Sequence, residues 1–305
     1  MEPTLFLLIL VFIFIQFITN HSIIARWVRN RFPAIMDHPM GRALFRPRFY
    51  KRQFAVPDTS RPPMQNAAVY RGNELDIASD TLHFVLNKYF PYYALLDANG
   101  KEKFVYRLQQ FMACKTFVIY SPEPYREMPI LVSASAIQLT FGLQQYMLPW
   151  FEYICIHPQE YIAIDPLRVL AGNVQGKSIT VSWKHFFEET LAHTSGENVG
   201  LHEMAHALHL QKTYYFDRKG ARFREAFYYF DHIDDALRKK EKTFDDRLFS
   251  DHALRNTDEF WAKSVELFFE KPTALYTRYH EVYTTLCLLL NQDPMQMLNF
   301  KDQGK

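Results

Sequence analysis

The stretch GLHEMAHALHL, residues 200–210, places two histidines four residues apart and a glutamate directly after the first of them. In an α-helix, residues four apart lie one turn above each other on the same face, so His202 and His206 can approach one metal ion together. Glu203 then lies beside that ion. The apolar residues on either side predict that this helix buries one face. We therefore expect a half-buried helix that carries a metal site.

Two neutral imidazoles and one carboxylate make a three-ligand zinc site, and a fourth position left open to water distinguishes a catalytic site from a structural one. A carboxylate beside the metal takes the proton of the water that attacks a polarised carbonyl, and Glu203 is suitably placed for this role. No cysteine lies close enough in the sequence to indicate a closed zinc finger. The alternative interpretation is a half-buried helix whose histidines are solvated or hydrogen-bonded.

The third metal ligand has to come from another part of the chain. The downstream helix offers Glu259, Glu266 and Glu270. Glu259 and Glu266 are seven residues apart and share one helix face, so spacing does not choose between them. Glu259 has a second interpretation, because Asn256 three residues earlier resembles a capping box, in which the carboxylate only satisfies a backbone N–H. His209 follows the motif on the same helix, but three consecutive ligands from one helix would crowd the metal, so it is not assigned.

The composition is typical of a globular protein with a large aromatic core. Of the 305 residues, 48% are hydrophobic and 16% aromatic. The formal net charge of +2 gives no reason to expect a nucleic-acid partner. Cys114, Cys155 and Cys287 are far apart and lie in apolar sequence, which is typical of reduced core thiols in a reducing compartment.

The N-terminus carries a long apolar segment, residues 4–24, which is long enough as a helix to cross the hydrocarbon core of a bilayer. A cleaved signal peptide is the competing interpretation, but Glu2 precedes the segment and no small-residue cleavage site follows it. Arg26, Arg29 and Arg31 all lie on its C-terminal side. The positive-inside rule therefore predicts a single-pass protein of the inner membrane, with the rest of the chain in the cytoplasm.

The sequence divides into three predicted parts: a transmembrane anchor and its flank at 1–30, a basic, proline-rich juxtamembrane linker at 31–76, and a folded domain at 77–305. Helical periodicity predicts a helical pair around the turn signal at 97–100, a buried helix at 130–143, and later helices at 256–269 and 273–290. Strands are predicted at 153–156, 161–164 and 178–183, with turn residues at 172, 173 and 176. The expected fold is α+β, mostly helical, with a small β-sheet that leads into the metal helix.

Five stretches resemble one known family. They are FPYYALLDANGKEKFVYRLQQFMACKTF (90–117), ILVSASAIQLTFGL (130–143), SITVSWKHF (178–186), GENVGLHEMAHALHL (196–210) and DEFWAKSVELFFEKP (258–272). In this order they are similar to the Mlc titration factor A (MtfA-like) zinc peptidases, whose zincin-like catalytic domain is related to the protease domain of anthrax lethal factor. The resemblance implies that His202, His206 and Glu259 bind zinc, that Glu203 is the base, and that Glu266 is a supporting carboxylate behind the ligands.

The chain departs from the family pattern at two positions. His209 replaces an aspartate three residues after the second histidine of the motif, and His252 replaces the tyrosine that related enzymes have seven residues before the glutamate ligand. A histidine can donate a hydrogen bond to an oxyanion as a tyrosine does. His252 is therefore a candidate for stabilising the transition state.

These observations predict a membrane-anchored zinc peptidase that faces the cytoplasm and cleaves a peptide or protein substrate. We expect an extended substrate to pair with the strand at 178–183. The alternative is a regulatory binding module that sequesters a protein partner such as a transcriptional regulator, because the resemblance implies that some relatives bind a repressor of sugar uptake. A third interpretation is a domain that metal only stabilises.

Overall fold

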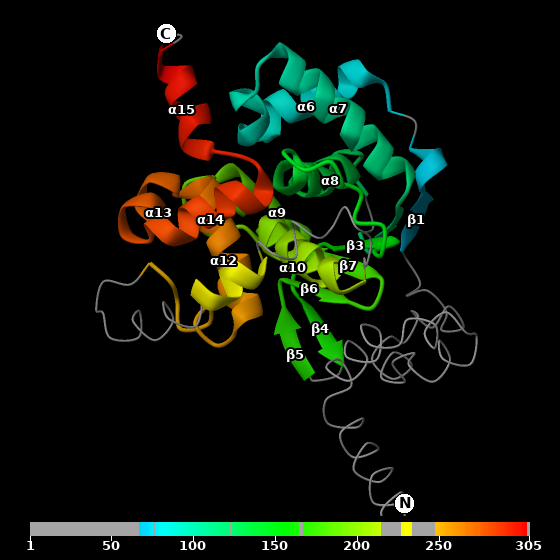
Figure 1. Ribbon diagram of the computed structural model, residues 1–305. Coiled ribbons are helices and arrows are strands. Elements are labelled where there is room, and N and C mark those ends of the chain that lie inside the picture. The colour runs from blue at the N-terminus through cyan, green and yellow to red at the C-terminus, as the bar shows by residue number, and fades with distance from the viewer. Residues whose placement is uncertain are drawn as a thin grey trace, which may run out of the picture. The chain divides into compact units, whose positions relative to one another are not determined.

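The computed structural model describes residues 67–303 except 76, 122–123, 165–166, 215–226 and 234–247 (Figure 1). The predicted membrane anchor at 4–24 and most of the predicted linker lie outside these residues. Within the described part of the chain, no helix is both long and apolar enough to cross a membrane. The described residues confirm an α+β fold that is mostly helical with a small mixed sheet.

The main sheet has five strands in the order β1-β2-β3-β7-β6. Its strands are β1 (Ala68–Arg71), β2 (Thr116–Ile119), β3 (Tyr153–His157), β6 (Gly172–Gln175) and β7 (Ser178–Ser182). The three central strands β2, β3 and β7 run parallel to one another, and the outer strands β1 and β6 are antiparallel to their neighbours. A separate two-stranded sheet pairs β4 (Tyr161–Ile164) with β5 (Leu167–Leu170).

The strand predictions were right for β3, β4 and β7, but they did not include β2 or β5 and were wrong at the edges of the main sheet. Gly172 and Asn173, predicted as turn residues, belong to β6, and the turn lies at Gly176, whose φ is +59°. Strand β1 lies inside the predicted linker, so the folded domain begins before residue 77. Both β1 and β6 are four residues long and pair on one side only, so they need few of the β-branched residues that reveal a buried strand.

Nine α-helices lie around the sheets in the described part of the chain, and residues 227–233 form a further helical segment. They are α6 (Ser79–Tyr89), α7 (Ala98–Ala113), α8 (Glu127–Thr140), α9 (Trp183–Leu191), α10 (Val199–Tyr214), α12 (Thr257–Glu270), α13 (Pro272–Arg278), α14 (His280–Leu290) and α15 (Pro294–Gln303), with short 3-10 turns η1 (Gly72–Glu74) and η2 (Pro91–Leu95). Helix α8 packs between α7 and α10 and is buried almost throughout, as its apolar sequence predicts.

The helix predicted at 273–290 is instead two helices, α13 and α14, which meet at Tyr279. Neither glycine nor proline marks this break in the sequence. Tyr279 leaves the helical conformation, and its ring packs edge-on against Phe249 at a centroid distance of 5.3 Å. A tertiary contact therefore accompanies the break, and local periodicity does not reveal it.

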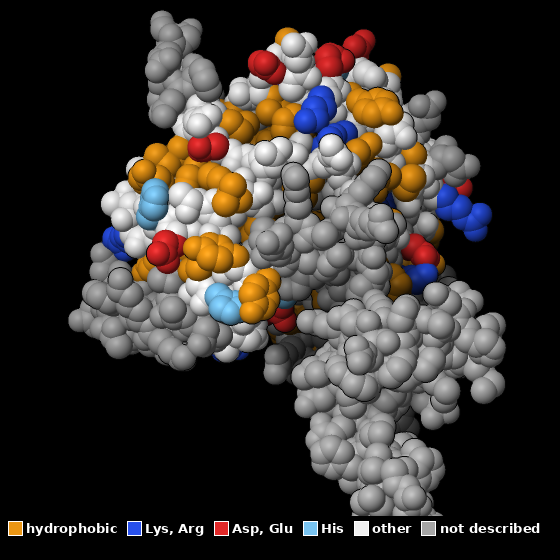
Figure 2. All heavy atoms as spheres, in the orientation of Figure 1, with side chains coloured by type: hydrophobic (Ala, Val, Ile, Leu, Met, Phe, Trp, Pro, Cys, Tyr) orange, Lys and Arg blue, Asp and Glu red, His pale blue; other side chains and the backbone are white. Residues whose placement is uncertain are grey.

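Some residues of the helical patterns face solvent instead of the core. Phe84 on α6 and Tyr106 on α7 are both exposed. Hydrophobic side chains also gather on the surface over α13 and α14, where Tyr276 and Leu288 are exposed (Figure 2). The core itself lies between the sheet and helices α6, α7, α8, α10 and α12.

Candidate metal centre

Helix α10, which carries the motif, packs against α8, α12 and the strands β6 and β7. Its start is fixed by Asn198, whose side-chain oxygen accepts a hydrogen bond from the N–H of Leu201 at 2.9 Å. Gly200 allows close approach of α9, because a Cβ there would lie 2.5 Å from the ring of Phe186. The sequence therefore places the motif in the first two turns of a well-anchored helix.

The structure brings His202, His206 and Glu259 together, with ligand atoms that all lie within 4.8 Å of one another. The two Nε2 atoms of the histidines are 3.0 Å apart. The Glu259 carboxylate lies 3.4 Å from Nε2 of His202 and 3.9 Å from Nε2 of His206. One cation can contact all three side chains, which are the three that the family resemblance implied.

The second helix of the site, α12, is held by contacts at its start and to α10. Asn256 caps it by accepting a hydrogen bond from the N–H of Glu259 at 2.9 Å. The Glu259 carboxylate faces the histidines, so its backbone is capped while its side chain takes part in the site. Two residues on, the indole N–H of Trp261 donates to the carbonyl of Ala205 at 2.8 Å and ties α12 directly to α10.

Glu266 lies behind the histidines on the same face of α12. Its Oε1 is 2.8 Å from Nδ1 of His202, and its Oε2 accepts the N–H of Asn198 at 2.7 Å. The side chain is almost completely buried, so this contact is not exchanged with water. A carboxylate on Nδ1 fixes the proton there and leaves Nε2 free to bind a metal. Glu266 is therefore in the supporting position that the resemblance implied.

The charges of the site favour a cation. Burial opposes protonation of His202, but the carboxylates of Glu259 and Glu266 outweigh it and raise its pKa to about 10. Burial, together with the neighbouring His202, lowers the pKa of His206 to about 4, so this imidazole is neutral as a metal ligand must be. The carboxylates thus stabilise one positive charge at this point.

Glu203 follows His202 directly on α10, and its side chain is buried. Burial, and the nearby carboxylates of Glu259 and Glu266, raise its pKa to about 8 in spite of His202. Among the described residues, Oε2 of Glu203 is buried and has no hydrogen-bond partner. Buried carboxylate oxygens are normally paired. A water molecule on a metal held by His202, His206 and Glu259 would supply the missing partner, so the residues present fit a bound metal.

The two histidines outside the motif have different positions. Nδ1 of His209 lies 2.7 Å from Oδ1 of Asp258, and His209 is not one of the three residues of the cluster. Nδ1 of His252 lies 3.2 Å from Oε2 of Glu259, and more than half of its side chain is exposed. His252 is therefore at the open side of the site, in contact with a predicted ligand.

Sequence reasoning missed the residues of β4 and β6 that lie beside Glu203. A Cβ on Gly172 would lie 2.6 Å from Cγ of Glu203, so β6 passes directly against this side chain. The hydroxyl of Tyr161 donates to Asn173 at 2.6 Å, and burial together with the charge of Glu203 raises the pKa of this phenol. No sequence signal marks these residues, because only the strand order brings them to the site.

The fold and this site are those expected of a metallopeptidase domain. Residues 71–290 match the family described as glucose-regulated metallo-peptidase M90, and the chain belongs to this family. The match confirms the MtfA-like resemblance and includes all the residues of the site. A comparison with curated proteins gives no match.

Proposed function

We propose that the protein is a zinc-dependent peptidase that uses His202, His206 and Glu259 to hold the metal. The observation that carries this proposal is the meeting of the three ligand atoms within 4.8 Å beside an unpaired Glu203 oxygen. Two imidazoles and one carboxylate, with a position open to water, are typical of catalytic zinc. Their nitrogen and oxygen donors also favour zinc over calcium or magnesium, which prefer oxygen ligands alone.

Bound zinc would polarise the scissile carbonyl and increase the acidity of the attacking water. Glu203 takes the proton of that water and passes it to the leaving amine, so that one carboxylate serves as base and then as acid. Burial raises the pKa of Glu203, which favours return of the proton to the leaving amine, and a bound metal cation would favour the ionised form that the base needs. His252, on the open side of the site, is proposed to donate a hydrogen bond to the developing oxyanion.

We propose that an extended substrate pairs with β6, and not with the strand at 178–183 as the sequence predicted. β7 is paired with β3 on one side and β6 on the other, so it has no free edge. Among the described strands, β6 ends the main sheet next to α10, with Gly172 against Glu203. An extended peptide added to β6 would present its backbone to the metal centre.

We also propose where in the cell the protein acts. The apolar segment 4–24 and the arginines that follow it support a single-pass anchor in the inner membrane, with the peptidase domain in the cytoplasm. The regulatory binding module has the family resemblance as its only support. We therefore propose a peptidase with a peptide or protein substrate.

The experiment compares full-length wild type with Glu203→Gln and with Glu188→Gln, which changes an exposed glutamate on α9. Bound zinc is measured by elemental analysis, and hydrolysis is followed on a mixture of unstructured peptides. We expect all three proteins to bind one zinc and only Glu203→Gln to lose turnover, by 100-fold or more, since general-base catalysis is worth about 10²–10⁴ in rate. An active Glu203→Gln protein would contradict the mechanism, and a zinc-free wild type would contradict the metal assignment.

A further inference from the structure

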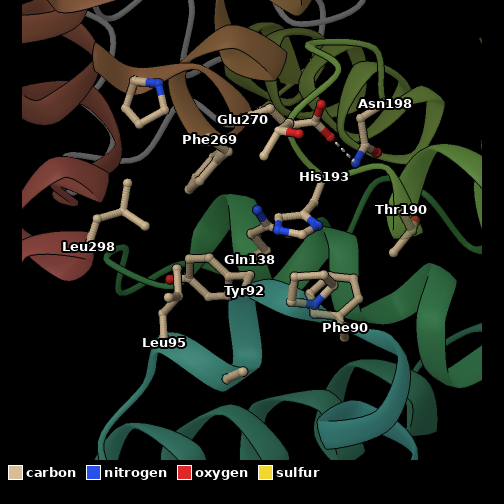
Figure 3. Close-up of a pocket in the computed structure, with 14 residues that line it drawn as sticks. Phe90, Tyr92, Leu95, Gln138, Thr190, His193, Asn198, Phe269, Glu270 and Leu298 are labelled. Carbon is tan, nitrogen blue, oxygen red and sulfur yellow. Dashed lines mark hydrogen bonds between the residues drawn. The ribbon is translucent and has the colours of Figure 1, made fainter. Parts of the chain in front are cut away.

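A cavity of about 470 Å³ lies away from the metal centre, between η2, the end of α9, the junction of α12 and α13, and α15 (Figure 3). None of the metal-centre residues lines it. Its apolar walls include Phe90, Tyr92, Leu95, Phe269 and Leu298. This volume is in the range of small-molecule sites, which are mostly apolar with a few polar groups that orient the ligand.

One of the polar groups of the cavity lacks a partner. Thr190, near the end of α9, lines the cavity and is 4% exposed. Its hydroxyl has no hydrogen-bond partner among the described residues. Buried hydroxyl groups are normally paired, so an unpaired one at a cavity wall indicates a place where a ligand can donate or accept a hydrogen bond.

The cavity also has a fixed negative charge. Among its lining residues, Glu270 is the only acidic one, and no lysine or arginine lines it. The Glu270 carboxylate accepts a hydrogen bond from the side-chain amide of Asn198 at 2.9 Å (Figure 3). It also accepts from the N–H of Gly196 at 2.7 Å and from the hydroxyl of Ser195 at 3.2 Å. Burial raises its pKa to about 7, so the carboxylate is mostly ionised at pH 8. Such a wall attracts cations and repels anions.

We propose that this cavity binds a small molecule that combines a protonated amine with an apolar body. The amine would lie toward Glu270 and the hydroxyl of Thr190, and the body would pack among the rings of Phe90, Tyr92 and Phe269. Aromatic rings suit this arrangement because they provide a large apolar surface and also attract cations. The site is separate from the metal centre, so its ligand is not the peptide that is cleaved.

The test uses phenethylamine as the probe and 2-phenylethanol, a neutral molecule of the same shape, as the comparison. Binding to the full-length protein is measured by calorimetry at pH 8. Phenethylamine should bind one site at millimolar concentration or better, and at least tenfold more tightly than 2-phenylethanol. No saturable binding of phenethylamine, or equal binding of the two probes, would overturn the proposal.

Variants then locate the bound probe. Glu270→Gln and Thr190→Val should each weaken phenethylamine binding, the first by tenfold or more, while Glu281→Gln at an exposed position on α14 should not. Leu298 is 40% exposed, so Leu298→Trp can narrow the cavity without disturbing the core and should also weaken binding. Circular dichroism checks that each variant is folded. Unchanged binding in folded Glu270→Gln and Leu298→Trp proteins would show that the probe binds elsewhere.

Discussion

Replacing Glu266 by glutamine tests whether this buried carboxylate orients a metal ligand. In the wild-type protein both oxygens of the Glu266 carboxylate accept a hydrogen bond, one from Nδ1–H of His202 at 2.8 Å and one from the N–H of Asn198 at 2.7 Å. Glutamine has one accepting oxygen and one donating amide group. Whichever way the amide is turned, it presents N–H to a donor on one side, so one of the two contacts is lost.

The magnitude follows from the role of such partners in metal sites. Loss of a carboxylate that fixes a metal-binding histidine typically costs 10-fold to 100-fold in metal affinity. This range corresponds to about 1.4–2.7 kcal/mol of binding free energy. We therefore expect the zinc dissociation constant of Glu266→Gln to increase by 10-fold to 100-fold, whereas loss of the Glu259 ligand should weaken binding further.

The assay is competition for zinc with a chelator of known affinity. Glu270→Gln is the matched control, because it is the same change one turn further along α12, at another buried carboxylate that accepts a hydrogen bond from Asn198. Glu270 does not contact His202 in the described structure, so the zinc affinity of the Glu270→Gln variant should stay within a few-fold of wild type. Equal zinc affinity in wild type and Glu266→Gln would refute the orienting role, and equal loss in both variants would assign the effect to general disturbance of α12.

Three further predictions concern the pH dependence, the substrate strand and the contact between the two site helices. Without metal the pKa of His202 is raised to about 10, and zinc requires the neutral ring, so zinc binding at pH 8 should release about one proton. For the same reason, the zinc affinity should rise with pH up to about 10. Calorimetry in buffers of different ionisation enthalpy measures the proton release, and a release of zero would contradict the prediction. Gly172→Ala should retain zinc but lose at least tenfold in turnover, since its new Cβ would displace the Glu203 side chain. Full activity would show that catalysis does not need β6 to lie this close to Glu203. Trp261→Phe should lower the free energy of unfolding by about 1–3 kcal/mol, because a buried hydrogen bond to Ala205 is lost. Urea unfolding measures this change, and an unchanged midpoint of the transition would show that packing alone holds α12 to α10.

Local sequence signals predicted the helices α6, α7, α8, α10 and α12 and the strands β3, β4 and β7. The apolar run of α8 predicts a helix buried on all sides, and the spacing of His202 and His206 puts both rings on one face of α10. These features depend on neighbours along the chain, so a short stretch of sequence contains them. The edge strands β1 and β6 were missed, since a short strand with one partner needs little in its own sequence to pair.

The choice between Glu259 and Glu266 shows what only the tertiary structure decides. The two residues are seven apart, so they share a face of α12 but lie about 10.5 Å apart along its axis. The way α12 crosses α10 puts Glu259 at the Nε2 side of His202 and Glu266 at its Nδ1 side. One carboxylate therefore lies where a metal binds and the other holds the opposite nitrogen of the same ring. The sequence contains both residues and their spacing, but the packing angle of two helices far apart in the chain assigns each its place.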